Sequence, residues 1–267
     1  MTSPSCDLTL TLIGGPTVLI ETCGLRLITD PTFDPPRLYQ TAPVHFEKTV
    51  GPAIEAEGVL PLDAVLLSHD QHLDNLDHAG RALLPRAGRV FTTPAGATRL
   101  GGENVLALAP FETTTLDLPG KGPGNGPGRL FVTAAPARHG PPGIEPLSGD
   151  VVGFLLGRDA PGDLLYVTGD TVFYEGVAEV ARRFSPKVVI VFAGSAEPRG
   201  RFHMTMDAND ALETAHAFPK ATLVAAHTDG WVHFKESAVE LAAAFATLGI
   251  ADRLVTLEPG RPRAFAA

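Results

Sequence analysis

The sequence predicts an α/β protein built as a layered sandwich, with helices covering the outer faces of β-sheets. The first third is a series of short β-rich runs separated by glycine turns, and the second half alternates β-rich runs with helical segments. A chain of 267 residues can bury one substantial core, and no shift in composition divides it. We therefore expect a single domain over residues 1–267.

Strands are expected to dominate the first half. Leucine alternates with threonine over Leu8–Leu12, which predicts a strand. The helical spacing of Leu76, Ala79 and Leu83 predicts a short helix after the fourth of these strands. The other strands predicted here are Thr17–Glu21, Leu25–Thr29, Ala64–Leu67, Arg89–Thr93, Val105–Leu108, Thr113–Leu118 and Leu130–Ala134, with a second short helix near Ala95–Leu100.

Strands and helices are expected to alternate in the second half. The predicted strands are Val151–Leu156, Leu164–Thr168, Lys187–Phe192 and Thr222–Ala226, and the predicted helices are Glu175–Arg183, Met206–Phe218 and Glu236–Leu248.

Two loops stand out by composition. Residues 31–61 are irregular and rich in proline, and a loop of this length is typical of a lid or pocket wall. Residues 119–128 read PGKGPGNGPG; no Ser or Thr follows the lysine, so a hairpin tip is favoured over a phosphate-binding loop.

The bulk composition restricts the partners. A formal charge of -9 argues against a nucleic-acid partner. Residues 1–7 show no basic region followed by a long apolar run, and no apolar stretch approaches about 18 residues, so we expect neither secretion nor membrane spanning. Cys6 and Cys23 are the only cysteines, which gives no disulfide framework and leads us to expect two small buried thiols in a cytoplasmic protein. A small-molecule substrate is expected, with homo-oligomer formation left open.

The segment Ser68–Asp77 is the most informative feature of the chain. It contains two histidines and three aspartates, directly after the apolar run Ala64–Leu67 that is predicted to be a buried strand. Neutral imidazole and carboxylate suit zinc, and also manganese or iron. The same residues are common in turns and helix caps, and Asp74 could simply begin the helix that follows.

Three distant residues favour the metal-site interpretation. His139, Asp170 and His227 each lie just beyond a predicted strand. Strand ends of an α/β protein gather at one edge, where loops converge and ligands bind. We therefore expect these residues to meet the Ser68–Asp77 segment there.

The order of these motifs resembles the metallo-β-lactamase superfamily over nearly the whole chain. The runs Ile13–Thr17, Thr29–Pro31 and His227–Phe234 resemble more narrowly the branch that contains ascorbate phosphate lactonase and N-acyl phosphatidylethanolamine-hydrolysing phospholipase D. The resemblance implies a four-layer αββα sandwich with one or two metal ions in a groove at the sheet edges, and hydrolase chemistry without a particular substrate.

The resemblance also implies a ligand set. It assigns His69, His72 and His139 to one metal, Asp74 and His227 to the other, and Asp170 as the bridge. The family pattern is His-x-His-x-Asp-His, whereas this chain has Gln71 and Asn75 at positions where the family offers imidazole. We favour His69, His72 and Asp74 as ligands, with the extra residue accommodated in the turn and a weaker second metal site.

The resulting functional hypothesis is metal-dependent hydrolysis. A bound cation makes hydroxide available for attack on an ester, lactone, amide or phosphodiester, with Asp170 orienting the nucleophile and His203 contacting the substrate or donating a proton. His233 is expected to support the loop that carries His227. The alternatives are a degenerate member that binds metal or a small ligand without turnover and, less favoured, a nuclease.

Overall fold

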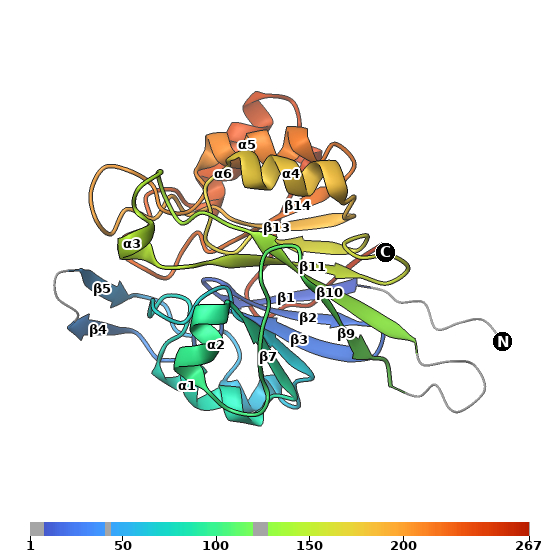
Figure 1. Ribbon diagram of the computed structural model, residues 1–267. Coiled ribbons are helices and arrows are strands. Elements are labelled where there is room, and N and C mark those ends of the chain that lie inside the picture. The colour runs from blue at the N-terminus through green and yellow to red at the C-terminus, as the bar shows by residue number, and fades with distance from the viewer. Residues whose placement is uncertain (1–7, 41–43, 120–127, 267) are drawn as a thin grey trace.

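Two seven-stranded β-sheets pack face to face with helices on both outer faces (Figure 1). The computed structural model describes residues 8–40, 44–119 and 128–266. Helices α1 (His78–Leu83) and α2 (Pro94–Leu100) lie on the side of the first sheet, and α4 (Glu175–Arg183), α5 (Ala208–Ala217) and α6 (Ala238–Thr247) cover the second. The predicted four-layer αββα architecture is therefore confirmed.

The first sheet is antiparallel on one side and parallel on the other. Its strand order is β16-β1-β2-β3-β6-β7-β8, and β3, β6, β7 and β8 run parallel. The bounds are β1 (Leu8–Gly14), β2 (Thr17–Thr22), β3 (Leu25–Thr29), β6 (Ala64–Leu66), β7 (Arg89–Thr92), β8 (Val105–Ala107) and β16 (Arg263–Phe265). Parallel pairing brings the carboxyl ends of these four strands to one edge.

The second sheet repeats this plan in the order β15-β14-β13-β12-β11-β10-β9. Strands β12 to β15 are parallel, whereas β9 to β12 pair antiparallel. The bounds are β9 (Thr113–Asp117), β10 (Arg129–Pro136), β11 (Val152–Gly157), β12 (Leu165–Val167), β13 (Val188–Phe192), β14 (Thr222–Ala226) and β15 (Leu254–Thr256).

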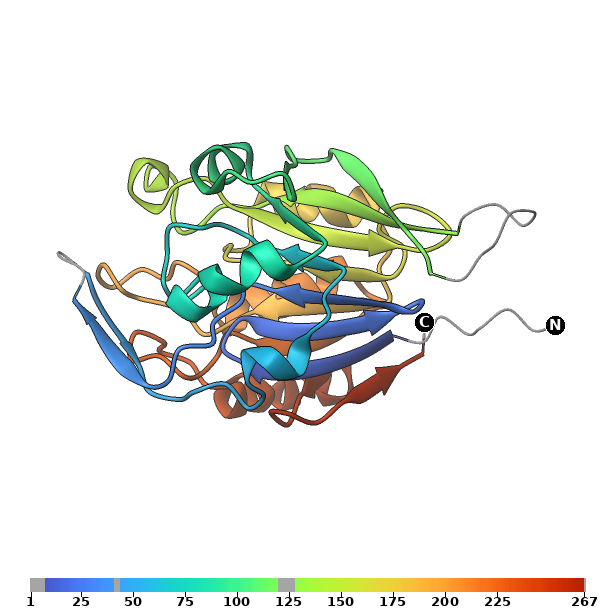
Figure 2. The same ribbon diagram turned by 90° about the horizontal axis from the view of Figure 1, so that it is seen from below.

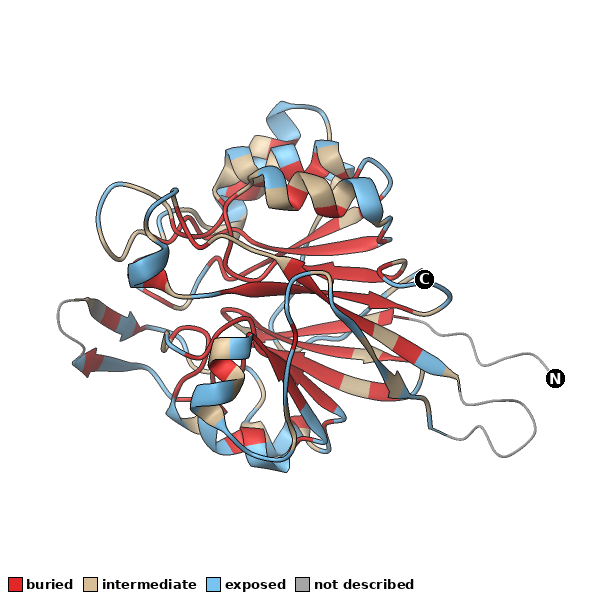
Figure 3. Cartoon of the chain, in the orientation of Figure 1, coloured by how far each residue is buried: buried red, intermediate tan, exposed pale blue. Residues whose placement is uncertain are grey.

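The main core lies between the sheets, where strand side chains such as Leu10, Ile190 and Phe192 are fully buried. Figure 3 shows that the strands are buried along most of their length while the outer helix surfaces are exposed. Every residue of β13 is buried because its sheet is covered on both faces. The ends of such strands are rigid supports for the loops that follow.

The proline-rich segment contains more structure than the sequence predicted. Within residues 31–61, β4 (Arg37–Gln40) and β5 (His45–Lys48) form a two-stranded hairpin, and a 3-10 helix covers Ala56–Val59. Short 3-10 helices also occupy Leu84–Arg86 and Ala251–Arg253. The hairpin and helix α3 (Glu145–Ser148) lie at the same end of the sandwich in Figures 1 and 2.

Two further expectations, on the cysteines and on the glycine-rich loop, fall only partly within the described residues. Cys23 is disulfide-bonded, so the expectation of two separate thiols is wrong for this residue, and Cys6 lies outside the described part of the chain. The predicted hairpin tip at 119–128 also lies largely outside it. No helix within the described ranges is long and apolar enough to cross a membrane.

Candidate metal centre

All six predicted ligands follow strand ends at one edge of the sandwich. His69, His72 and Asp74 lie in the loop after β6, His139 follows β10, Asp170 follows β12, and His227 directly follows β14. All are buried except His72, which is partly buried. The structure thus brings together residues far apart in the sequence, in two groups.

The first group, here called the imidazole group, consists of His69, His72 and His139. Their donor atoms lie within 4.8 Å of one another. Nε2 of His69 is 2.9 Å from Nδ1 of His72, and Nε2 of His139 is 3.1 Å from the same atom. Three ring nitrogens therefore converge on one point.

Hydrogen bonds behind two of these rings fix their orientation. The Ser68 hydroxyl donates to Oδ1 of Asp30 over 2.8 Å, so Nδ1 of His69, 2.8 Å from that hydroxyl, donates to it. Nδ1 of His139 donates to the Met204 carbonyl over 2.8 Å. Each ring is left with a lone pair on Nε2, the atom that faces the group.

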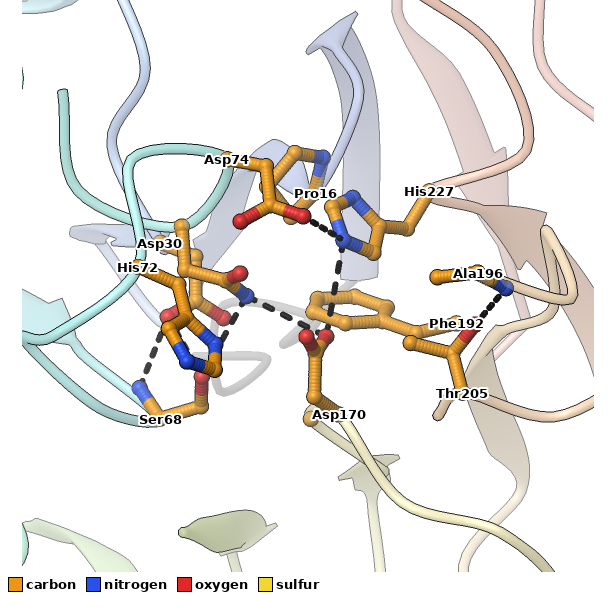
Figure 4. A network of polar contacts seen from close by, with 12 residues as sticks. Pro16, Asp30, Ser68, His72, Asp74, Asp170, Phe192, Ala196, Thr205 and His227 are labelled. Carbon is orange, nitrogen blue, oxygen red and sulfur yellow. Dashed lines mark hydrogen bonds and ion pairs between the residues drawn. The ribbon is translucent and has the colours of Figure 1, made fainter. Parts of the chain in front are cut away.

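The second group, the carboxylate group, consists of Asp74, Asp170 and His227, whose donor atoms also lie within 4.8 Å of one another (Figure 4). Nε2 of His227 is 3.5 Å from Oδ1 of Asp170 and 3.8 Å from Oδ2 of Asp74. The other Asp170 oxygen is 3.5 Å from Nε2 of His139. Asp170 therefore faces both groups, as a bridging ligand would.

The sequence profile described as the beta-lactamase superfamily domain matches residues 25–228. The chain belongs to this superfamily. The UPF0173 protein YddR of Bacillus subtilis (strain 168) is 25% identical over 268 residues, covering 96% of this chain and 99% of that protein.

Solved structures of the superfamily fold are similar to this one. The isothiocyanate hydrolase from Delia radicum gut bacteria has a TM-score of 0.80 at 24% identity, covering 97% of this chain and 100% of that chain. A possible metal-dependent hydrolase from Veillonella parvula DSM 2008 has a TM-score of 0.81 at 21% identity, covering 96% and 99%. At these identities the likeness shows the shared fold.

Asn75 and His233 form hydrogen bonds with the two aspartates of the carboxylate group. The Asn75 amide donates to Oδ1 of Asp170 over 3.2 Å and lies 3.5 Å from the Ser68 hydroxyl. Nε2 of His233 donates to Oδ2 of Asp74 over 2.8 Å. The sequence interpretation associated His233 with His227; the structure places its hydrogen bond on Asp74.

Burial sets the protonation of the site. It lowers the pKa of His69 and His72, and it lowers the pKa of His139 and of His227 to about 3. These imidazoles are therefore neutral at neutral pH, as metal ligands must be.

The carboxyl groups respond in opposite directions. Burial, with Asp74 and Asp30 nearby, raises the pKa of Asp170 well above its usual range. Burial acts in the same sense on Asp74, but the His233 hydrogen bond and neighbouring imidazoles outweigh it and lower the pKa of Asp74.

The residues fit divalent cations. Oδ1 of Asp74, Oδ2 of Asp170 and Nε2 of His227 are buried without a hydrogen-bond partner. Such orphaned atoms are costly in a protein interior unless a ligand satisfies them. In the imidazole group, Nδ1 of His72 can donate a hydrogen bond to only one of the two Nε2 atoms that face it, so one lone pair is left without a donor. A cation would satisfy both groups.

Asp70 and Gln71 lie in the ligand loop but outside both groups. Nε of Arg99 donates to both Asp70 oxygens at 3.1 Å, and Arg81 donates to the Asp70 carbonyl at 2.8 Å. Gln71 is exposed and packs against Gly149, where an added Cβ would lie 2.1 Å from its Nε2. Asp70 thus fixes the loop, and Gln71 is the residue accommodated between His69 and His72.

His203 also lies outside both groups. Its Nε2 is 3.2 Å from Asp210, and its Nδ1 is 3.7 Å from Asp207 at the start of α5. The hydrogen bond with Asp210 raises the pKa of His203. The ring also lines a cavity of about 230 Å³ with Arg138 and Phe202. A substrate role for His203 stays a prediction.

Sequence reasoning missed the connection from Asp30 through Ser68 to His69. Asp30 accepts the backbone N–H of Ser68 over 2.7 Å as well as its hydroxyl. The sequence did offer a signal for this contact. Asp30 directly follows β3, which pairs in parallel with β6, so Asp30 lies beside the start of the loop that carries His69.

Proposed function

We propose that this protein is a metal-dependent hydrolase that cleaves an ester, lactone, amide or phosphodiester bond of a small-molecule substrate. The main support for this proposal is the position of Asp170 between the two donor groups. Its Oδ1 faces His227 of the carboxylate group, and its Oδ2 faces His139 of the imidazole group. Buried convergent donors with unsatisfied atoms are costly to maintain, and a functional metal accounts for them.

The imidazole group would hold one ion through His69, His72 and His139, and the carboxylate group would hold a second through Asp74 and His227, with Asp170 between them. Zinc suits the imidazole nitrogens, and manganese or iron also suits a mixed nitrogen and oxygen set. A divalent cation in such a site lowers the pKa of water to about 7 and stabilises negative charge on substrate oxygen.

The protein's own groups would position the reactants. Asp170 lies between the two donor groups, where it would orient the attacking water. The Ser68 and Met204 contacts keep the His69 and His139 rings in place during turnover. His203 is retained as a candidate substrate contact because it lines a neighbouring cavity.

Elemental analysis paired with a substrate screen tests this function. Protein grown with zinc or manganese would be analysed for bound metal and assayed against lactone, ester, amide and phosphodiester substrates. Asp170→Asn should lose both metal and turnover, while Asp252→Asn, at an exposed carboxylate, should retain both. Stoichiometric metal without turnover on any class would favour the binding-only alternative. Full metal occupancy in Asp170→Asn would refute the bridging role.

A further inference from the structure

We propose that the protein has a second ligand site, which binds a small organic acid with an apolar body at the end of the sandwich opposite the metal centre. The site is a cavity of about 690 Å³ formed by the loops that follow α4 and α5, here called the αβ-loop cavity. None of the candidate metal ligands lines it, so the inference does not depend on the function proposed above.

The two loops carry the same short sequence pattern. Residues 184–187 read Phe-Ser-Pro-Lys between α4 and β13, and residues 218–220 read Phe-Pro-Lys between α5 and β14. Strands β13 and β14 are parallel neighbours in which Val188 pairs with Thr222, so the loops that precede them lie side by side. Both copies of the pattern therefore line one cavity.

The αβ-loop cavity has the size and the walls of a small-molecule site. Its volume lies within the range of about 300–1,000 Å³ that such sites occupy. Ala181 and Phe184 line it from the α4 side, and Ala217 and Phe218 line it from the α5 side. The apolar body of a ligand would remove this surface from water, which favours binding.

Lys187 and Lys220 determine the charge of the ligand. They are the only charged residues among those that line the cavity, and both are exposed. Within the described ranges, neither side chain has an ion-pair or hydrogen-bond partner. The chain as a whole has a formal charge of -9, so two lysines without an acidic neighbour on the cavity wall are a local exception. They favour a ligand whose acidic group lies beside them.

Arg253 offsets the negative end of helix α5 beside the cavity. The carboxyl end of a helix carries partial negative charge, which by itself disfavours an anion. The Arg253 guanidinium donates to the carbonyls of Ala215, Phe218 and Ala221 at 3.3, 2.8 and 2.7 Å. Because a cation already engages these carbonyls, the two exposed lysines decide the charge that a ligand meets.

The cavity is separate from the metal centre. It lies at the amino ends of β13 and β14, whereas His227 directly follows the carboxyl end of β14. The five residues of β14 place roughly 15 Å between the two ends. In Figure 1 the C-terminus, next to the cavity residue Ala266, lies at the opposite end of the sandwich from α3 and the β4–β5 hairpin. A ligand in the cavity would therefore not contact a metal ion.

Calorimetric titration of the metal-loaded protein with naphthaleneacetate, and with its uncharged isostere naphthaleneacetamide, tests the site. We expect saturable binding of one acid per chain, about 5-fold tighter than binding of the amide. In Lys187→Met/Lys220→Met this preference should disappear, because methionine keeps an apolar stem and removes the charge. Lys235→Met should retain the preference, since this exposed lysine lies outside the cavity.

Two further variants separate the cavity from other places where an acid could bind. Ala181→Phe fills the cavity and leaves both lysines, so it should weaken binding of the acid and of the amide alike. His139→Ala/His227→Ala should bind the acid as the wild type does. Loss of binding in that variant would mean that the carboxylate ligates a metal ion, and would overturn the proposal.

The lysine variant decides the proposal even if Ala181→Phe fails to fold, because both lysines are exposed. Absence of saturable acid binding to the wild type would overturn the proposal, and so would a preference for the acid that survives the loss of both lysines. Neither result bears on the metal-dependent function, which the metal content of the protein tests separately.

Discussion

Replacing Asp77 by alanine should destabilise the protein by about 3–5 kcal/mol, because it would leave a buried lysine without its counter-ion. The Asp77 carboxylate is fully buried and accepts from the backbone N–H groups of Phe33, Asp34 and Gly80 at 2.9, 2.6 and 2.8 Å. It also pairs with Nζ of Lys48 at 3.0 Å. One side chain thus joins the ligand loop, the start of α1 and the β4–β5 hairpin.

The expected loss of stability depends on which buried charged group each substitution leaves behind and on how many hydrogen bonds that group keeps. In Asp77→Ala, the Lys48 ammonium, only 4% exposed, loses its ion-pair partner in a buried position. In Lys48→Met, the carboxylate retains three backbone donors, so the loss should be smaller. Asp63→Ala is the control, since this exposed carboxylate accepts one backbone N–H, from Arg26, and should cost about 0.5–1.5 kcal/mol.

Urea unfolding followed by Trp231 fluorescence measures these differences. Trp231 is the only tryptophan of the sequence and is buried. The centroid of its ring lies 5.7 Å from Nζ of Lys48, so its emission reports on the hairpin region. A free-energy loss in Asp77→Ala no larger than that in Asp63→Ala would refute the account of a buried, structurally essential carboxylate.

Three further predictions concern the site. Ser68→Ala should weaken zinc binding about 10- to 100-fold in chelator competition, because His69 loses its hydrogen-bond partner; unchanged affinity would contradict this. Asp170→Asn should lower kcat/KM by at least about 1000-fold on a confirmed substrate, and a smaller loss would refute its role in orienting water. Because Asp210 raises the pKa of His203, the stability this pair supplies is complete below the ordinary histidine pKa and lost as pH rises through the raised value. His203→Gln should therefore lower Tm more at pH 6 than at pH 9 by calorimetry, and an equal shift at both would count against the pair.

The strands were predictable because they are long apolar or alternating runs bounded by turns, as in Leu25–Thr29 and Thr222–Ala226. The β4–β5 hairpin could not be predicted, because its short strands lie in an irregular, proline-rich segment without such a run. Its buried aromatics Tyr39 and Phe46 pack with Trp231 from a distant loop. Strand β16 likewise depends on pairing with β1 at the other end of the chain. Such tertiary contacts leave little local signal.

The candidate ligands were predictable because each follows a strand, and parallel strands bring such positions to one edge. Their supporting contacts were not. Nothing local in the sequence indicates that Asp30 accepts from Ser68, or that Asn75 donates to Asp170, since each contact joins loops from different strands. In the sequence, Asn75 was identified only as a departure from the family pattern. In the structure, its amide donates a hydrogen bond to Asp170.

The metal content of the purified protein tests the central claim most directly. Plasma mass spectrometry would be applied to the wild type and to the variant His139→Ala/His227→Ala, each produced with zinc and manganese, with Asp252→Asn as control. The account predicts bound metal in the wild type and in the control, and none in the double variant. Wild-type metal content in the double variant would contradict the assignment of both donor groups.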